Sequence, residues 1–310
     1  MCEGERKPLT STMRHPATLA AFLAACAGVM LFSFMDAAMK GLGLALGAYN
    51  ALLWRNLAGL GISGAAYAFQ PTGWPTRAAM RLHIWRGMVV AVMALLFFWS
   101  ITVLPLAEAI ALSFIAPLIA LYLAAVMLGE RIGREAIIAS ALGIIGVAVI
   151  MTGRMGGQAH GDEAWLGVAA VLTSAVLFAY NLILARQQAQ IARPGEIAFF
   201  QTLTVLCCLS LGAPWLAVVP AGEHWPLIVG AAVLAVSSLY LLSWAYARAE
   251  AQVLVPVEYS AFVWAALCGW VFFAEPLTWP VIAGTVLIVT GCLIAARAKP
   301  QPMQVEEAVA

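Results

Sequence analysis

Charged side chains are scarce in this sequence: Asp, Glu, Lys and Arg make up 10% of its 310 residues, against about 25% in an ordinary soluble domain. Hydrophobic residues make up 64%. A soluble fold cannot bury that much apolar surface and still cover itself with polar groups, so the expected partner is a lipid bilayer. The net charge of +1 excludes a nucleic acid partner, because nucleic-acid binding calls for a basic patch.

Groups that carry catalysis or bind metals are also few. The four histidines are expected in loops or at helix ends, where they offer no components for a metal site or a Ser–His hydrolase. Asp36 and Asp162 are the two aspartates, and they form no membrane dyad because Asp162 is expected in a loop. No Walker A phosphate loop occurs, so ATP is not expected to drive the protein directly. The sequence predicts no enzyme, no metal and no cofactor.

Apolar runs long enough to cross about 30 Å of hydrocarbon recur along the chain, separated by short polar breaks. The first run is too long for a signal-peptide core and is expected to remain as the first helix. We predict an all-α integral membrane protein with ten transmembrane helices. They are expected near residues 17–39, 47–69, 83–104, 107–128, 133–152, 164–186, 196–219, 224–247, 251–273 and 277–297.

Basic residues divide unevenly between the two sides of this arrangement. Thirteen of the 16 fall on the side that holds the N-terminus, Lys40 and Arg154 fall on the other, and Arg55 lies within the second helix. Because Lys and Arg concentrate in cytoplasmic loops, we expect both termini in the cytoplasm and a multi-pass protein of a cell inner membrane. The remaining predicted segments are a cytoplasmic stretch 1–16, an external linker 153–163 and a cytoplasmic tail 298–310.

A shift of 145 residues aligns the two halves of the chain, 17–152 and 164–297. It matches two tryptophans, two glutamates, an aspartate with an asparagine, and two aromatic residues. These pairs are Trp99 with Trp244, Glu130 with Glu275, Asp36 with Asn181, and Phe114 with Tyr259. Each half holds five predicted helices, and an odd number inverts the second half relative to the first. Inverted repeats are the usual construction of secondary transporters.

Two segments carry a family resemblance. Residues 104–131 resemble the fourth helix of EamA-type members of the drug/metabolite transporter superfamily, with the sequence LPLAEAIALSFIAPLIALYLAAVMLGER. Residues 249–276 resemble its counterpart in the second half, with the sequence AEAQVLVPVEYSAFVWAALCGWVFFAEP. The resemblance covers residues 17–297. It implies ten helices in two inverted five-helix repeats and the export of amino acids, cofactors or other metabolites.

Polar residues within the predicted helices collect at two depths, and such residues commonly mark a transport pathway. The outer third of the first half holds Asp36, Arg55, Trp99, Glu108 and Ser113. The inner third of the second half holds Tyr180, Asn181, Tyr240, Trp244, Glu258 and Tyr259. We interpret the two groups as an outer and an inner gate around a central substrate site. The alternative is that polar residues simply prefer helix ends, where water and headgroups hydrate them.

Several of these residues also have a structural interpretation. Asp36 and Lys40 are four residues apart on one helix face and can form an ion pair, while Arg55 can pair with Asp36 across two helices. Glu258 follows a proline by two residues and can be a helix-start residue. Pro117 removes a backbone hydrogen bond and either loosens or bends the fourth helix.

Aromatic side chains indicate the class of solute. Tyr240 and Trp244 form a stripe on the eighth helix and Trp264 lies near mid-depth on the ninth, although such stripes are also ordinary packing surfaces. Facing a cavity, they suit a small amphipathic solute such as an amino acid. A larger cofactor-type solute, riboflavin or S-adenosylmethionine, is the alternative. A non-transporting membrane sensor or receptor is the alternative of another class, but residues 299–310 are too few for a signalling segment.

Glycines on the fifth and tenth helices allow another helix to approach closely. They are Gly143, Gly146, Gly284 and Gly291. The two helices are repeat equivalents and are expected outside the transport core. A homodimer through these helices is one prediction that follows.

Overall fold

The computed structural model describes residues 16–69, 74–128, 134–155, 162–189, 191–246 and 257–297, and this part of the chain is helical without strands. The elements are α1 (Pro16–Leu46), α2 (Ala48–Ala68), α3 (Arg77–Val103), α4 (Leu106–Ser113), α5 (Ala116–Leu128), α6 (Arg134–Met155), α7 (Asp162–Ala189), α8 (Pro194–Ser210), α9 (Ala213–Leu216), the 3-10 turn η1 (Gly222–His224), α10 (Trp225–Tyr246), α12 (Ala261–Phe273) and α13 (Trp279–Arg297). The predicted segments 1–16, 153–163 and 298–310 lie largely outside these residues.

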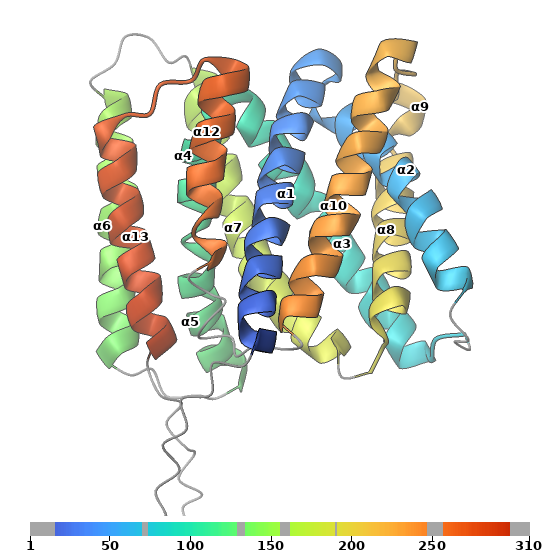
Figure 1. Cartoon of the computed structure of the whole chain (residues 1–310), viewed down its shortest axis with the longest axis horizontal. Coiled ribbons are helices and arrows are strands. Elements are labelled where there is room, and N and C mark those ends of the chain that lie inside the picture. Colours follow the sequence, from blue (N-terminus) through green and yellow to red (C-terminus); the bar gives the residue numbers. More distant parts are fainter. Residues whose placement is uncertain are drawn as a thin grey trace, which may run out of the picture.

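The described helices cross the bundle ten times, with α4 and α5 forming one pass and α8 and α9 another. Because the number of passes is even, α1 begins and α13 ends on the same side (Figure 1). We call this side the terminal face and the opposite side the far face. The all-α membrane fold with ten helices in two inverted five-helix repeats is confirmed.

Four of the described helices are long and apolar enough to cross a membrane, judged by length and composition alone. These apolar stretches are Leu19–Leu46, Arg77–Val103, Glu163–Ala185 and Gly222–Leu242. Shorter apolar helices, including Ala261–Phe273, contribute to other passes. The ten-pass bundle therefore combines long continuous helices with short or interrupted ones.

Two predicted helix ends are wrong, and both change the environment of a polar residue. Helix α1 continues to Leu46 rather than ending near residue 39, so Lys40 lies inside the bundle with 4% of its surface exposed. Helix α3 begins at Arg77 rather than near residue 83. The hydroxyl of Thr76 accepts a hydrogen bond from the Ala79 amide and caps this earlier start. His83 is consequently a buried helical residue instead of a helix-end residue.

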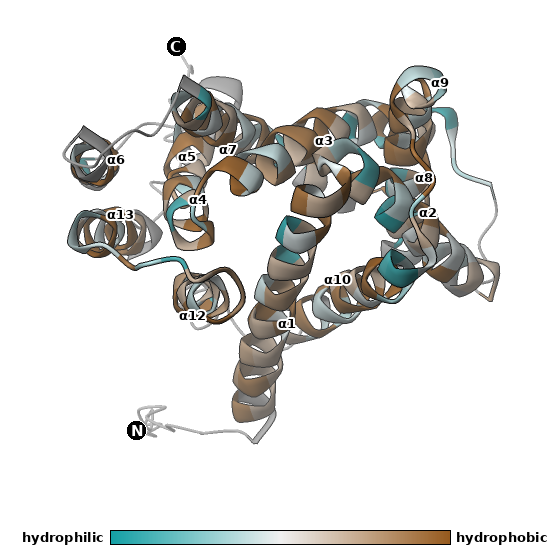
Figure 2. Cartoon of the chain, turned by 90° about the horizontal axis from the view of Figure 1, so that it is seen from above, coloured by the Kyte–Doolittle hydropathy of each residue, from teal (hydrophilic) through white to brown (hydrophobic). Residues whose placement is uncertain are grey.

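Helix packing follows a twofold pattern. The most extensive contacts join α6 with α13, α1 with α10, and α3 with α7. The shift of 145 residues relates α6 to α13, α1 to α7 and α3 to α10. The α1–α10 contact is therefore the repeat equivalent of the α7–α3 contact. Figures 1 and 2 show α6 and α13 at one end of the bundle, α2 and α8 at the other, and the exchanged helices between them. This arrangement is the one expected for two inverted copies related by an axis in the membrane plane.

A serine hydrogen bond recurs in the two exchanged contacts. In the α3–α7 contact, the Ser174 hydroxyl donates to the Met93 carbonyl at 2.9 Å. In the α1–α10 contact, the Ser238 hydroxyl donates to the Gly28 carbonyl at 2.8 Å. The shift of 145 pairs Met93 with Ser238 and places Ser174 opposite Val29, the neighbour of Gly28. An equivalent bond therefore occurs at the same depth in both contacts. Its donor is on α7 in one contact and on α10, the repeat equivalent of α3, in the other.

The α6–α13 contact depends on glycine. A Cβ atom added to Gly146 would lie 2.7 Å from the carbonyl oxygen of Gly284 and 2.6 Å from Ile288 Cγ1. The two backbones thus touch within one chain, and a larger residue at either position would force them apart. The outer surface of α6 exposes Ile137 and Ile144. A homodimer through these helices stays a prediction and would involve that outer surface rather than Gly146 and Gly284.

Candidate functional site

Both repeats interrupt a helix at the same position. In the fourth pass, a turn at Phe114 and Ile115 separates α4 from α5. In the ninth pass, a turn at Tyr259 and Ser260 precedes α12, and the shift of 145 aligns the two turns. The backbone bonds there run to the third preceding residue, as in Phe114 to Ala111 at 3.2 Å. Pro117 contributes to the first turn, but its equivalent is Phe262, so proline is not the general cause.

The rings of Phe114 and Tyr259 meet between the two interrupted helices. Their centroids are 5.2 Å apart and their planes are inclined by 88°, which is an edge-to-face contact. The Cys292 thiol of α13 donates to the Phe114 carbonyl at 3.3 Å. Residues related by a twofold axis can touch only close to that axis. The ring pair therefore lies where the two repeats meet.

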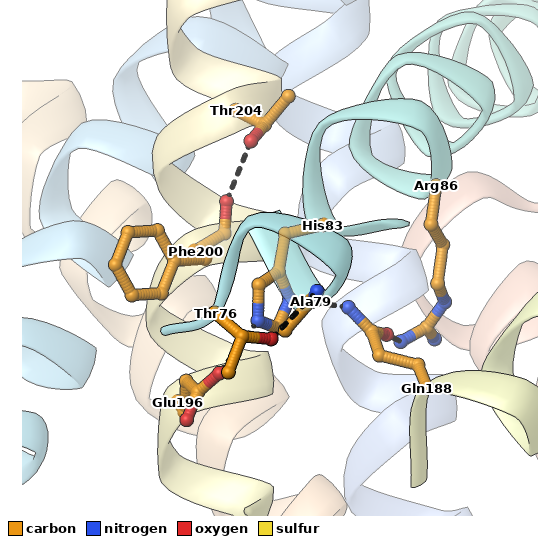
Figure 3. Close-up of polar contacts among 8 residues, drawn as sticks. All are labelled: Thr76, Ala79, His83, Arg86, Gln188, Glu196, Phe200 and Thr204. Carbon is orange, nitrogen blue, oxygen red and sulfur yellow. Dashed lines mark hydrogen bonds and ion pairs between the residues drawn. The ribbon is translucent and has the colours of Figure 1, made fainter. Parts of the chain in front are cut away.

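A buried polar network joins three helices near the terminal face (Figure 3). His83 of α3 contacts two residues, Glu196 of α8 through Nε2 at 2.8 Å and the amide of Gln188 of α7 through Nδ1. The side chains of His83 and Gln188 are fully buried, and the imidazole stacks on the Phe200 ring. These contacts fit the tautomer in which Nε2 carries the proton and donates to Glu196. The network connects the first repeat (α3) with the second (α7 and α8).

Arg86 extends this network along α3. Its Nη1 donates to the Gln188 carbonyl oxygen, and its Nε donates to Asn181 Oδ1 at 2.8 Å. One residue away, Trp85 Nε1 donates to the Tyr180 hydroxyl at 3.0 Å. Two of the predicted inner-gate residues, Tyr180 and Asn181, are thus bound by α3.

Sequence reasoning missed this network. It assigned Arg86 to the cytoplasmic side as a topology signal and His83 to a helix end. Arg86 lies nine residues into α3, which is about 14 Å along the helix axis. An ionisable group at such a depth needs a partner. The predicted helix start near residue 83 placed Arg86 in the first turn instead, so its depth became visible only with the earlier start of α3.

An ion pair ties the two repeats together at the far face. The Lys40 ammonium pairs with the Glu275 carboxylate, donates to the Leu104 carbonyl at 2.6 Å and lies 5.3 Å from the centre of the Phe273 ring. The other Glu275 oxygen accepts the Leu106 amide at 2.8 Å. This cluster joins α1, the α3–α4 linker and the α12–α13 linker. Lys40 is an ion-pair residue as expected, but its partner is Glu275 rather than Asp36. Glu130, the repeat partner of Glu275, lies outside the described residues.

Asp36 lies one helical turn from Lys40 and is 1% exposed. Its Oδ1 atom has no hydrogen-bond partner in the described part of the chain. Arg55 attracts Asp36 through space, while its guanidinium lies 5.5 Å from the centre of the Phe98 ring and its Nη1 lies 3.5 Å from the Met35 sulfur. The buried carboxylate is therefore near a cation but incompletely hydrogen-bonded.

The other predicted outer-gate residues are dispersed over the third and fourth passes. Glu108 is buried at 5% exposure in α4. The Ser113 hydroxyl donates to the Ala109 carbonyl of its own helix at 2.9 Å. Trp99 is partly buried and packs on the hydrophobic core. The Ser113 hydroxyl thus bonds within its own helix, and Trp99 belongs to the packed core.

The remaining predicted residues lie on the second repeat. Tyr240 and Trp244 of α10 are 58% and 40% exposed, and the Glu258 side chain is also exposed. Trp264 is partly buried and packs on a small cluster that includes Ala25 and Val257. Of this group, Tyr259 is the residue whose ring meets its own repeat equivalent, Phe114.

Sequence and structure comparisons agree with this architecture. The EamA-like transporter family matches residues 19–152 and again residues 165–297. A similar protein is the Pseudopaline exporter CntI of Pseudomonas aeruginosa, 28% identical over 275 residues, covering 86% of this chain and 93% of that protein. Another is a riboflavin transporter of Rhizobium johnstonii, 29% identical over 228 residues, covering 71% and 73%. One crystal structure superposes with a TM-score of 0.61 at 20% identity, covering 89% of this chain and 96% of that one, so it shares the fold. With both halves matched separately, this chain belongs to the EamA-like transporter family.

Proposed function

We propose that this transporter exports a small amphipathic metabolite, an amino acid or a similar solute, from the cytoplasm by alternating access. The observation that carries the proposal is the pair of equivalent helix interruptions, whose Phe114 and Tyr259 rings meet between the repeats. Interrupted helices at a repeat interface are the usual place for a transporter's substrate site. The ring pair offers an apolar surface there for the solute body.

Polar contacts on both faces support alternating access. At the far face, Lys40 of the first repeat binds Glu275 of the second. At the terminal face, His83 and Arg86 of the first repeat bind Gln188 of the second. A solute that reaches the ring pair from one face and leaves by the other requires each set of contacts to separate in turn. Inverted repeats accomplish this by exchanging their conformations.

The carboxylate of Glu258 supports a solute with an amino group. It precedes Tyr259 on the terminal-face side of the interruption. With the terminal face in the cytoplasm, Glu258 and Tyr259 form part of the cytoplasmic entrance, where the carboxylate attracts an ammonium group. Export is also the activity named for the Pseudomonas relative.

A larger cofactor-type solute is the second candidate. The similarity to a riboflavin transporter over 71% of this chain favours it. Proteoliposomes that contain the purified protein and an internal solute pool distinguish the two classes by counterflow. We expect uptake of labelled leucine or phenylalanine and little uptake of riboflavin or S-adenosylmethionine. Riboflavin uptake without amino-acid uptake would replace the first candidate with the second.

The orientation is tested by labelling single cysteines introduced into a protein whose native cysteines have been replaced. Glu223→Cys lies on the far face and Trp74→Cys on the terminal face, and both side chains are well exposed. An impermeant maleimide added to intact cells should label position 223 and leave position 74 unlabelled until the cells are broken. The reverse pattern would place the termini outside and contradict export through the entrance proposed above.

A further inference from the structure

An open cavity of about 310 Å³, a depression in the surface and not an enclosed chamber, lies at the far face beside the Lys40–Glu275 ion pair. Two charges of opposite sign line it, together with one hydroxyl and several apolar side chains. The lining residues are Lys40, Leu44, Thr102, Val103, Leu104, Pro105, Phe273 and Glu275. Its volume is at the lower end of the roughly 300–1,000 Å³ of small-molecule pockets, which suits a single amino acid better than a flavin.

Both charges of the pair are held by the backbone of the first repeat. Lys40 Nζ donates to the Leu104 carbonyl, and Glu275 accepts the Leu106 amide. The side chains are 5% and 16% exposed, so water screens the pair only weakly. Separating the two charges without replacement would leave each one buried and uncompensated, which is strongly unfavourable.

The net charge of a ligand decides whether it can separate this pair. A zwitterion supplies a carboxylate for Lys40 and an ammonium group for Glu275, so every charge keeps an opposite partner. A ligand with one charge compensates one side and leaves the other unpaired. The apolar lining of Leu44, Val103 and Phe273 can then contact an aliphatic or aromatic side chain.

We propose that this cavity is the exit subsite of the transporter and that it binds the zwitterionic head group of an amino-acid solute. The carboxylate binds Lys40, the ammonium group binds Glu275, and the solute replaces the direct contact between the repeats. The far face can then open with the solute bound at its mouth. This inference rests on the proposed function and names the solute chemistry that its exit side recognises.

Binding of three leucine derivatives to the purified full-length protein tests the subsite. Leucine carries both charges, leucinamide lacks the carboxylate and N-acetylleucine lacks the ammonium group. We expect leucine to bind about tenfold or more tightly than either derivative, since one charge-assisted contact has about that effect. Lys40→Gln should abolish the preference for leucine over leucinamide. Glu275→Gln should abolish the preference for leucine over N-acetylleucine.

Control variants separate recognition from folding. Glu223→Gln removes a far-face carboxylate that does not line the cavity and should keep the wild-type preferences. The double variant K40Q/E275Q leaves no unpaired charge, so it should fold and lose both preferences.

The possible results distinguish this inference from the proposed function. If leucine is transported but both single variants keep the wild-type preferences, the subsite is overturned and the transport proposal stands. The subsite is equally overturned if K40Q/E275Q folds and still prefers the zwitterion. If the wild-type protein neither binds nor transports any amino acid, the proposed solute class is wrong and the subsite falls with it.

Discussion

Asp36 and Asn181 occupy the same position in the two repeats, but their surroundings differ. Asn181 accepts a hydrogen bond from Arg86, which belongs to a network that continues to His83 and Glu196. Asp36 has an oxygen without a hydrogen-bond partner in the described residues. The shift of 145 replaces Arg86 by Ala231, so the helix that packs on α1 offers no equivalent donor.

This difference shows how two copies of one backbone arrangement acquire separate roles. The terminal-face contact combines neutral and charged side chains that hydrogen-bond to one another. The far-face contact holds an ion pair and a buried carboxylate that is incompletely bonded. An unsatisfied buried group costs about 1–3 kcal/mol, and a polar residue that serves transport rather than stability is expected to carry such a cost. We therefore expect the terminal-face network to contribute more to stability and Asp36 to contribute more to transport.

Arg86→Met should have the largest effect on stability. It removes the donors to Asn181 and Gln188 but keeps much of the side-chain volume. Leaving both acceptors buried without these bonds should lower the free energy of unfolding by about 3 kcal/mol or more. Thermal or denaturant unfolding in detergent measures the loss. Arg81→Met, an exposed arginine on the same helix, is the matched control, and an equal loss in the two variants would contradict the role of the network.

Asp36→Asn makes the first repeat resemble the second at this position. A neutral amide is less costly to bury than a carboxylate, but Arg55 loses its nearby counter-charge. We therefore expect a small net change in stability. Transport should fall and its pH dependence should change if the carboxylate is part of a gate or carries a coupling proton. Uptake measured over a range of pH provides the test. Unchanged uptake over this range would show that Asp36 is structural.

Glu258→Gln tests the charge that distinguishes the second interruption from the first, where the equivalent residue is Ser113. The variant keeps the size and hydrogen-bonding capacity of the side chain. It should weaken transport of cationic and zwitterionic solutes several-fold while affecting neutral solutes little. Counterflow with charged and neutral amino-acid analogues measures the ratio. Equal rates for the variant and the wild type with every solute would mean that Glu258 serves only as a helix-start residue.

Ser174→Ala and Ser238→Ala should have the smallest effects and should resemble each other. Each removes one hydroxyl bond to a backbone carbonyl in equivalent helix contacts. Interhelical bonds of this kind contribute about 0.6 kcal/mol on average in a membrane protein. Unfolding in detergent should therefore show two small and similar losses. A loss several times larger for one serine would reveal that the two contacts are energetically unequal.

Much of the fold could be predicted from the sequence because hydrophobic thickness and helix rise limit the solutions. Ten apolar runs predicted ten passes, and an odd number per half required inversion. The alignment of Phe114 with Tyr259 also identified a pair that meets at the repeat interface. The ends of α1 and α3 were misplaced because Lys40 and His83 were expected at the ends of the apolar runs.

The partners of the buried polar groups were decided only by the tertiary structure. Spacing along α1 placed Asp36 and Lys40 on one face, but the Lys40 ammonium pairs with the Glu275 carboxylate of the other repeat. Hydropathy likewise gave no reason to connect His83 with Gln188 and Glu196. Hydropathy along the chain determines how far a helix extends through the membrane. The rotation of each helix and its neighbours determine which side chains meet, because a polar group in a weakly screened interior must bond with whatever the packing places beside it.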